Sequence, residues 1–222
     1  MSQISLSQQA YERIKQKIVA LELPPGAVID EAALQQELEL GRTPIREALK
    51  RLSLEKLVVI VPRRGMFVTD IGISDLQQLF EVRLALESLA ARLAARRGGA
   101  HQWQRMAAAL EGLTADSPSN EALIEMDKTC HELIYEAADN QFLRDTCVTH
   151  YALSLRLWHY FLRKMGAMRG AVIEHVYILE ALRAGDADQA ARLMEKHIRA
   201  FQEEIQSVML GAPQPVDAVT ST

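Results

Sequence analysis

Three histidines and one aspartate in the C-terminal half have the types and spacing of a metal site. Asp127 and His131 are four residues apart, so on a helix their side chains project from one face about one turn apart. His175 stands 10 residues before Gly185, and His197 stands 12 residues after it. If Gly185 is the turn of an antiparallel helix pair, both imidazoles lie about 15 to 18 Å along their helices and therefore at similar heights.

Three imidazoles and one carboxylate form a mixed set of nitrogen and oxygen ligands. Such a set suits zinc, nickel, manganese or iron and leaves positions open for water or an anion. A single histidine among apolar residues is more often a core or surface residue than a ligand, but four candidates with consistent geometry reverse that preference. We therefore expect a divalent metal ion, with zinc as the first choice, bound by Asp127, His131, His175 and His197.

Basic residues gather in the N-terminal third of the chain. Arg42 stands at the start of an expected helix and Arg46 one turn later on the same side, so both can reach base edges with the paired donors that match guanine O6 and N7. Thr43 can bind a phosphate beside the free amides of the helix N-terminus. A second basic group suits a hairpin tip pressed against DNA. The expected DNA-binding residues are Arg42, Thr43, Arg46, Arg63, Arg64 and Gly65.

The overall charge conceals this basic region. The chain has 222 residues and a formal net charge of -4, which by itself is untypical of a nucleic-acid binder. Residues 1–70 carry a net charge of +1 and residues 71–222 carry -5, and the segment 42–64 holds seven basic residues against two acidic ones. The charge pattern therefore favours DNA binding by the N-terminal part only.

The two cysteines and the N-terminus indicate the compartment. Cys130 and Cys147 have neither the number nor the spacing of a disulfide framework, so we expect buried thiols in a reducing cytosol. The N-terminus lacks the apolar core of a signal peptide, and no apolar run approaches the roughly 20 residues that span a bilayer. The expected location is the cytoplasm, without membrane contact.

Residues 1–70 are expected to form a winged helix-turn-helix domain. Apolar residues recur at helical spacing over residues 7–21, a second helix covers residues 31–38, and a third begins at Thr43-Pro44. The β-branched residues at 57–61 and the segment 66–69 predict a hairpin. In this arrangement the third helix enters the major groove, and the hairpin tip reaches the flanking groove or backbone.

The rest of the chain predicts an all-helical domain over residues 75–210, after a connection at 71–74 with helix caps at Ser74 and Asp75. The fold class is therefore mainly α, a winged helix followed by a helical bundle, and the last residues, 211–222, are expected to form a disordered tail. The expected helices of the bundle cover residues 75–97, 101–113, 120–138, 141–165, 170–184 and 186–210.

The N-terminal motifs closely resemble the GntR family of bacterial regulators. The motifs are PG at 25–26, ExxL at 31–34, LGRTPIREALxxL at 40–52 and RRGxxV at 63–68. This resemblance implies DNA reading by Arg42, Thr43, Arg46 and the wing glycine Gly65. One position departs from the family pattern: Ser or Thr usually precedes the first arginine, and Gly41 stands there instead. A helix cap or phosphate contact from that side chain is therefore absent.

The C-terminal motifs look like the FCD effector domain of the FadR-type branch. They are FEVRxxxE at 80–87, the Asp127 and His131 pair, and the pattern around the two later histidines at 174–197. Together with the winged helix, the resemblance covers about residues 8–208. It implies a helical bundle in which the four candidate ligands surround a central cavity. The residue before the first histidine is usually apolar and is Cys130 here, which leaves the ligands intact and brings a thiol near the site.

These observations predict a homodimeric repressor that binds a palindromic operator and releases it when a small carboxylate enters the metal site. Repression follows from family analogy only. Arg83 is a candidate for the carboxylate because arginine forms bidentate pairs with such groups, although a salt bridge to Glu87 at i,i+4 explains it equally well. Arg156 and His159 are weaker candidates.

Two alternatives stay open at this point. A metal-sensing regulator would need no organic effector. A metal-dependent hydrolase fused to a winged helix could use the same ligands to activate water. The hydrolase is disfavoured because the segment starting at His131-Glu132 begins like a zinc-protease motif but has Tyr135 in place of its second histidine.

Overall fold

The computed structural model describes residues 4–114, 118–161 and 169–209. The chain divides into two compact units. Unit 1 comprises residues 1–76 together with residues 152–160, and unit 2 comprises residues 77–151 and 161–222. Each unit is described by itself.

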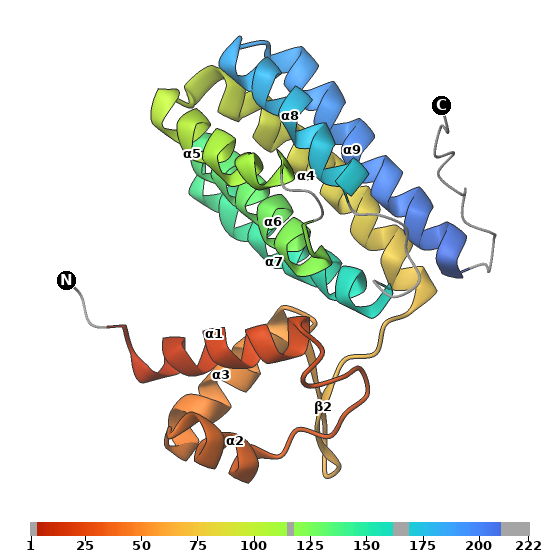
Figure 1. Cartoon of the computed structure of the whole chain (residues 1–222). Helices are drawn as coiled ribbons and strands as arrows, with labels where there is room; N and C mark the ends of the chain where they lie inside the picture. The colour runs from red at the N-terminus through yellow and green to blue at the C-terminus, as the bar shows by residue number, and fades with distance from the viewer. Residues whose placement is uncertain (1–3, 115–117, 162–168, 210–222) are drawn as a thin grey trace. The chain divides into compact units, whose positions relative to one another are not determined.

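Unit 1 has the order of elements expected for a winged helix-turn-helix (Figure 1). The two strands are antiparallel, with Val58 opposite Val68 and Val61 opposite Gly65. An isolated bridge from Val28 to Phe67 extends the wing by a contact that the sequence pattern did not suggest. The elements are α1 (Leu6–Val19), α2 (Glu31–Leu38), α3 (Arg42–Leu54), β1 (Val58–Val61) and β2 (Gly65–Val68).

Helix caps and apolar spacing explain why these elements form. The side chain of Asp30 accepts hydrogen bonds from the backbone amides of Ala32 and Ala33 and so begins α2. Gly41 precedes α3 without a side-chain cap, as its residue type requires. Apolar side chains of the three helices meet in one core, whose most buried members are Ala10, Ile14, Ile18, Ile45, Leu49 and Leu52.

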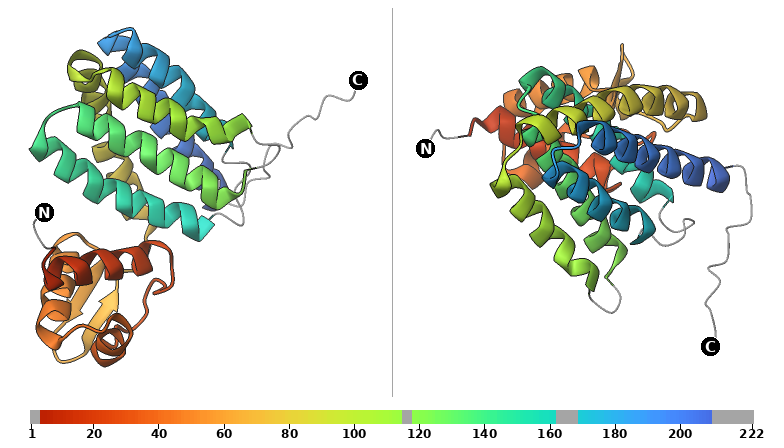
Figure 2. Two further views of the ribbon diagram at one scale, coloured as in Figure 1. Left: turned by 60° about the vertical axis from the view of Figure 1, so that its left-hand side comes forward. Right: turned by 90° about the horizontal axis from the view of Figure 1, so that it is seen from above.

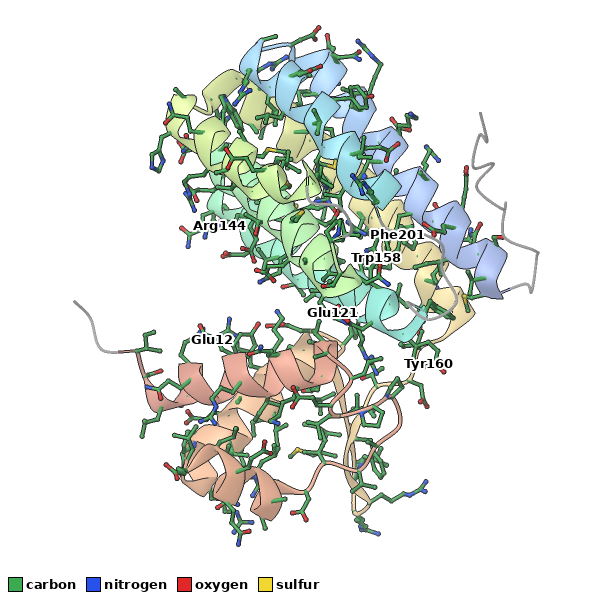
Figure 3. The ribbon with its side chains drawn as sticks, viewed as in Figure 1. Glu12, Glu121, Arg144, Trp158, Tyr160 and Phe201 are labelled. Atoms are coloured by element: carbon green, nitrogen blue, oxygen red, sulfur yellow. The ribbon has the colours of Figure 1, made fainter. Side chains whose placement is uncertain are left out.

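Every element of unit 2 in the described residues is a helix. Its core contains Phe80 and Phe201, whose rings meet edge to face with centroids 5.5 Å apart; Phe201 is labelled in Figure 3. No helix in the described ranges is long and apolar enough to cross a membrane. The elements of unit 2 are α4 (Ile73–Arg97), α5 (Ala100–Leu110), a 3-10 turn (Glu111–Thr114), α6 (Asn120–Ala137), α7 (Gln141–Phe161), α8 (Arg169–Arg183) and α9 (Ala187–Met209). As an exception, residues 73–76 of α4 and 152–160 of α7 group with unit 1.

Helices α8 and α9 form the antiparallel pair that the sequence predicts, and they run side by side in both views of Figure 2. Gly185 makes the turn with a φ of +68°, a conformation that glycine adopts without the steric penalty of a side chain. The carboxylate of Asp186 then accepts a hydrogen bond from the backbone amide of Gln189 and caps α9.

The structure differs from the sequence expectations mainly at element ends. Helix α4 begins at Ile73, so the expected connection at 71–74 is partly helical and the predicted caps, Ser74 and Asp75, lie inside the first turn. Asp75 is favourable there because a carboxylate complements the positive end of the helix dipole. The predicted continuation of α7 to residue 165 and the tail at 211–222 lie outside the described residues.

Candidate metal centre

The four predicted ligands come from three helices of unit 2 and converge on one point. Asp127 and His131 lie one turn apart on α6, His175 lies on α8 and His197 on α9. All four side chains are buried. One donor atom from each residue lies within 4.8 Å of the donors of the other three. The structure therefore brings together every residue that the spacing grouped.

Asp127 stands between the histidines. Its Oδ1 atom is 2.9 Å from Nε2 of His175 and 3.6 Å from Nε2 of His197. Its Oδ2 atom is 3.7 Å from Nε2 of His131. The Nε2 atoms of His131 and His197 are 3.3 Å apart. The same ring nitrogen of each histidine thus faces the common centre.

The imidazoles of His131 and His197 contact carboxylates through Nδ1, the ring nitrogen on the side away from the common centre. Nδ1 of His131 is 2.6 Å from Oε2 of Glu87, and Nδ1 of His197 is 3.1 Å from Oε2 of Glu174. A carboxylate accepts the Nδ1 proton and so leaves the Nε2 lone pair free for a metal, which is the usual outer arrangement around histidine ligands.

This arrangement fits a bound cation. With both Nδ1 atoms protonated, the Nε2 atoms of His131 and His197 present lone pairs to one another at 3.3 Å, and two acceptors at that distance repel unless a positive charge lies between them. Three imidazole nitrogens and one carboxylate oxygen are also a donor set that zinc and related divalent ions accept. The residues present therefore fit a metal ion.

Burial and neighbouring charges keep His175 and Asp127 in the forms that bind a metal. Burial, followed by the proximity of His197, lowers the pKa of His175 to about 4. Burial opposes ionisation of Asp127, but the nearby His131 and the contact with His175 hold the pKa of Asp127 well below its usual range. At neutral pH the site thus offers a neutral imidazole and an ionised carboxylate, as metal binding requires.

Neither cysteine joins the ligand set. Cys130 and Cys147 are buried free thiols. Burial and then the charge of Asp127 raise the pKa of Cys130, and burial with the charge of Glu87 raises the pKa of Cys147 to about 12. Both side chains therefore remain protonated and act as small apolar groups.

Arg83 forms the salt bridge with Glu87 that its i,i+4 spacing allows. Its Nε atom is 2.5 Å from Oε1 of Glu87, and both side chains are buried. The other effector candidate, Arg156, lies in the part of α7 that groups with unit 1, where it donates a hydrogen bond to the carbonyl oxygen of Thr69. Burial lowers the pKa of Arg156 to about 10. Effector binding by either arginine stays a prediction.

Sequence reasoning missed the residues that hold the ligands. Tyr151 donates its hydroxyl hydrogen to Asp127, and Tyr135 donates to Glu87. A signal was available for two of them, because Tyr135 follows His131 by four residues and Glu87 follows Arg83 by four, which places each pair on one helix face. The contact between Glu87 and His131 joins α4 to α6 and has no counterpart in local spacing.

The predicted DNA-binding residues of α3 are exposed at its N-terminal end. Arg42 and Thr43 occupy its first two positions, and the side chain of Arg46 is 45% exposed. Nε of Arg46 lies 3.6 Å from Oε2 of Glu31 on α2. A shallow surface hollow at this end is lined by Arg42, Thr43, Arg46, Glu47 and Lys50.

The predicted wing residues lie at the hairpin tip. Arg63, Arg64 and Gly65 are all exposed, and the amide of Arg64 donates to the carbonyl oxygen of Val61 to close the turn. Gly65 has a φ of +109°, which side-chain-bearing residues rarely adopt. The tip is therefore a tight basic turn without a side chain at its last position.

Two family models match consecutive segments of the chain. The first describes bacterial regulatory proteins of the gntR family and matches residues 6–68. The second describes the FCD domain and matches residues 78–200, a range that contains all four candidate metal ligands.

Two regulators of Escherichia coli (strain K12) are similar over most of their length. The HTH-type transcriptional repressor RspR is 25% identical over 205 residues, which are 91% of this chain and 90% of that protein. The HTH-type transcriptional repressor GlaR is 26% identical over 216 residues, or 92% of this chain and 98% of that protein. Among solved structures, E. coli McbR/YncC has the same fold, with a TM-score of 0.82 at 22% identity over 94% of this chain and 99% of that one.

Proposed function

We propose that this chain, which belongs to the GntR family of bacterial regulatory proteins and carries an FCD domain, is a homodimeric repressor. In this proposal the protein binds a metal ion and a palindromic operator, and it releases the operator when a small carboxylate binds. The family makes it a DNA-binding transcription regulator and not an enzyme, so the hydrolase alternative is set aside. The observation that carries the metal part is the convergence of four buried donors, two of which, His131 and His197, also contact carboxylates through Nδ1.

DNA reading is assigned to the exposed end of α3 and to the wing. Arg42 and Arg46 would contact base edges, and Thr43 would contact a phosphate beside the free amides of the helix. The hairpin tip, with Arg63 and Arg64, would add phosphate contacts. Two copies of the chain would place two such surfaces on the half-sites of a palindrome. This action belongs in the cytoplasm, where bacterial operator DNA lies.

The metal ion would be held by Asp127, His131, His175 and His197. Zinc is the first choice, and nickel, manganese and iron suit the same donors. When bound, the ion supplies positive charge at a buried point and open coordination positions that accept an anion. The protein residues orient the donors, and the burial of the site removes competition from bulk water.

A small carboxylate, such as a hydroxy, sugar or dicarboxylic acid, is the proposed effector. A divalent ion with one ionised aspartate and three neutral histidines retains about one positive charge, which favours an anion in the open position. Arg83 supplies a second charge close by, because its guanidinium lies 5.5 Å from the ring of Tyr151, which contacts Asp127. Regulation requires a coupling of about 1 to 3 kcal/mol, which changes DNA affinity roughly 5- to 150-fold.

The test is a thermal-shift screen of organic acids on the metal-loaded protein, followed by titration of each hit into a complex of protein and operator. The matched control is the His175→Ala, His197→Ala double variant, which retains the N-terminal unit and lacks two metal ligands. We expect acids to stabilise the wild type and release DNA, and to have no effect on the control. Release by neutral compounds alone, or equal action on both proteins, contradicts the proposal.

The buried ion pair of Arg83 with Glu87 favours a second candidate, a metal-sensing regulator without an organic effector, because the arginine already has a carboxylate partner. The two candidates differ in whether the metal exchanges. Dialysis against a chelator would remove the ion and change operator affinity in a metal sensor. In an organic-acid sensor, the ion stays bound and DNA affinity responds to the acid.

A further inference from the structure

The carboxylate of Glu87 is shared by three donors from two helices. Its Oε1 atom is 2.5 Å from Nε of Arg83, one turn earlier on α4. Its Oε2 atom is 2.6 Å from Nδ1 of His131 and 2.6 Å from the hydroxyl of Tyr135, both on α6. Glu87 is 1% exposed and Arg83 is 2% exposed, so water does not compete for these contacts. One side chain therefore connects the candidate metal site to the candidate effector arginine.

The two carboxylate oxygens of Glu87 contact different partners and therefore have different roles. Oε2 keeps the proton of His131 on Nδ1 and so directs the Nε2 lone pair toward the ligand centre. Oε1 pairs with Arg83 in the same position that a carboxylate ligand would take on this side of the guanidinium. An external carboxylate that binds Arg83 through Nε must therefore move Oε1 away.

We propose that Glu87 is the positioning residue of this site, holding His131 for the metal through one oxygen and masking Arg83 from carboxylates through the other. The inference rests on the proposed metal- and carboxylate-dependent function and deepens it. Displacement of Oε1 rotates the carboxylate that holds His131, so carboxylate binding at Arg83 alters the coordination of the metal.

The first experiment measures Co²⁺ binding to the metal-stripped full chain by its visible absorption. The Glu87→Gln variant keeps the size of the side chain and removes its charge, and we expect the Co²⁺ dissociation constant to rise about 10- to 100-fold with a changed spectrum. The control is Glu136→Gln, which removes a carboxylate on α6 that pairs with Arg105 at the surface. This control should bind Co²⁺ as the wild type does.

A second variant is included in case Glu87→Gln fails to fold, since that change removes the carboxylate that pairs with a buried arginine. Arg83→Met with Glu87→Gln removes both charges, a replacement that buried ion pairs often tolerate, and it should also bind Co²⁺ more weakly. Arg83→Met alone keeps the contact of Glu87 with His131 and should retain the wild-type spectrum. A wild-type spectrum and affinity in the double variant contradicts the positioning role.

Acetate, a small carboxylate, is used as a probe of Arg83 to test whether Glu87 masks it. Added to Co²⁺-loaded protein, it should change the spectrum of Glu87→Gln at a lower concentration than that of the wild type, and the double variant should lose this sensitivity. Equal responses in all three proteins, or none in any, overturn the masking. If the wild type takes up no Co²⁺, the proposed function fails and this inference with it. If wild type and Glu87→Gln bind Co²⁺ alike, only the inference fails.

Discussion

The hydroxyl of Tyr151 donates a hydrogen bond of 2.7 Å to Oδ2 of Asp127, and this contact leaves Oδ1 facing His175 and His197. Removing the hydroxyl frees the aspartate to rotate and leaves a buried oxygen with one partner fewer. We expect Tyr151→Phe to weaken metal binding about tenfold, measured by competition with a chromogenic chelator. Tyr177→Phe, at a 55% exposed tyrosine of α8, is the control and should bind as the wild type does. Equal affinities in all three would show that the hydroxyl has no part in holding Asp127.

Loss of either histidine contributed by α8 or α9 should abolish metal-dependent stabilisation. A ligand that binds only the folded state raises stability by mass action, by about 2.7 kcal/mol when its concentration is 100 times its dissociation constant. His175→Ala and His197→Ala should therefore lose bound metal in elemental analysis and show no rise in melting temperature when metal is added. His101→Ala changes an exposed histidine and should respond as the wild type does. Full metal occupancy in a variant would remove that histidine from the site.

The metal-free protein should lose stability as the pH falls from about 6.5 toward 4, because the pKa of His175 is lowered from 6.5 to about 4 in the folded state. In this window the unfolded chain binds a proton at His175 that the folded chain does not, so acid favours unfolding. Urea denaturation at several pH values measures the effect. His175→Gln has no imidazole to titrate and should show a shallower slope between these limits. An identical slope in both proteins would assign the pH dependence to other groups.

The two DNA-binding groups should differ in how they affect specificity. Arg46→Ala should weaken operator binding by about 1 to 3 kcal/mol and relax the preference for one base, because it removes a contact to a base edge. Arg63→Ala should weaken binding to every DNA sequence more evenly and reduce its salt dependence, because it removes a phosphate contact. Fluorescence anisotropy with specific and scrambled duplexes at several salt concentrations separates the two effects. Equal losses on both duplexes for both variants would reject this division of roles.

Local rules in the sequence account for most of the fold. Helical spacing and the Gly185 turn predict elements that the structure contains, because each depends on residues close in the chain. The sequence predicts that α4 starts at residue 75, two residues after the observed start at Ile73. The difference arises because Ser74 and Asp75 are favourable both as caps and in a first helical turn. The short 3-10 turn after α5 and the bridge from Val28 to Phe67 lacked a periodic pattern that could reveal them.

In the candidate metal site, too, local spacing reveals some of the residues and leaves others unrecognised. Asp127 and His131 could be paired from their spacing, and the two later histidines from their distances to Gly185. The outer residues could not be identified in this way, because the contact of Glu87 with His131 spans 44 positions in the chain and depends on how two helices pack.

The turn at Gly185 between α8 and α9 determines which insertions and deletions leave the geometry of the candidate metal site unchanged. His175 and His197 are separated by 21 residues, nearly all of them helical. Inserting or deleting one residue within either helix, between the histidine and the turn, rotates that histidine by about 100° around the helix axis. The same change in the segment between α5 and α6 turns no ligand, because Asp127 and His131 lie together on α6. Homologues that retain the metal should therefore vary in length before α6 and keep the spacing from His175 to His197 constant.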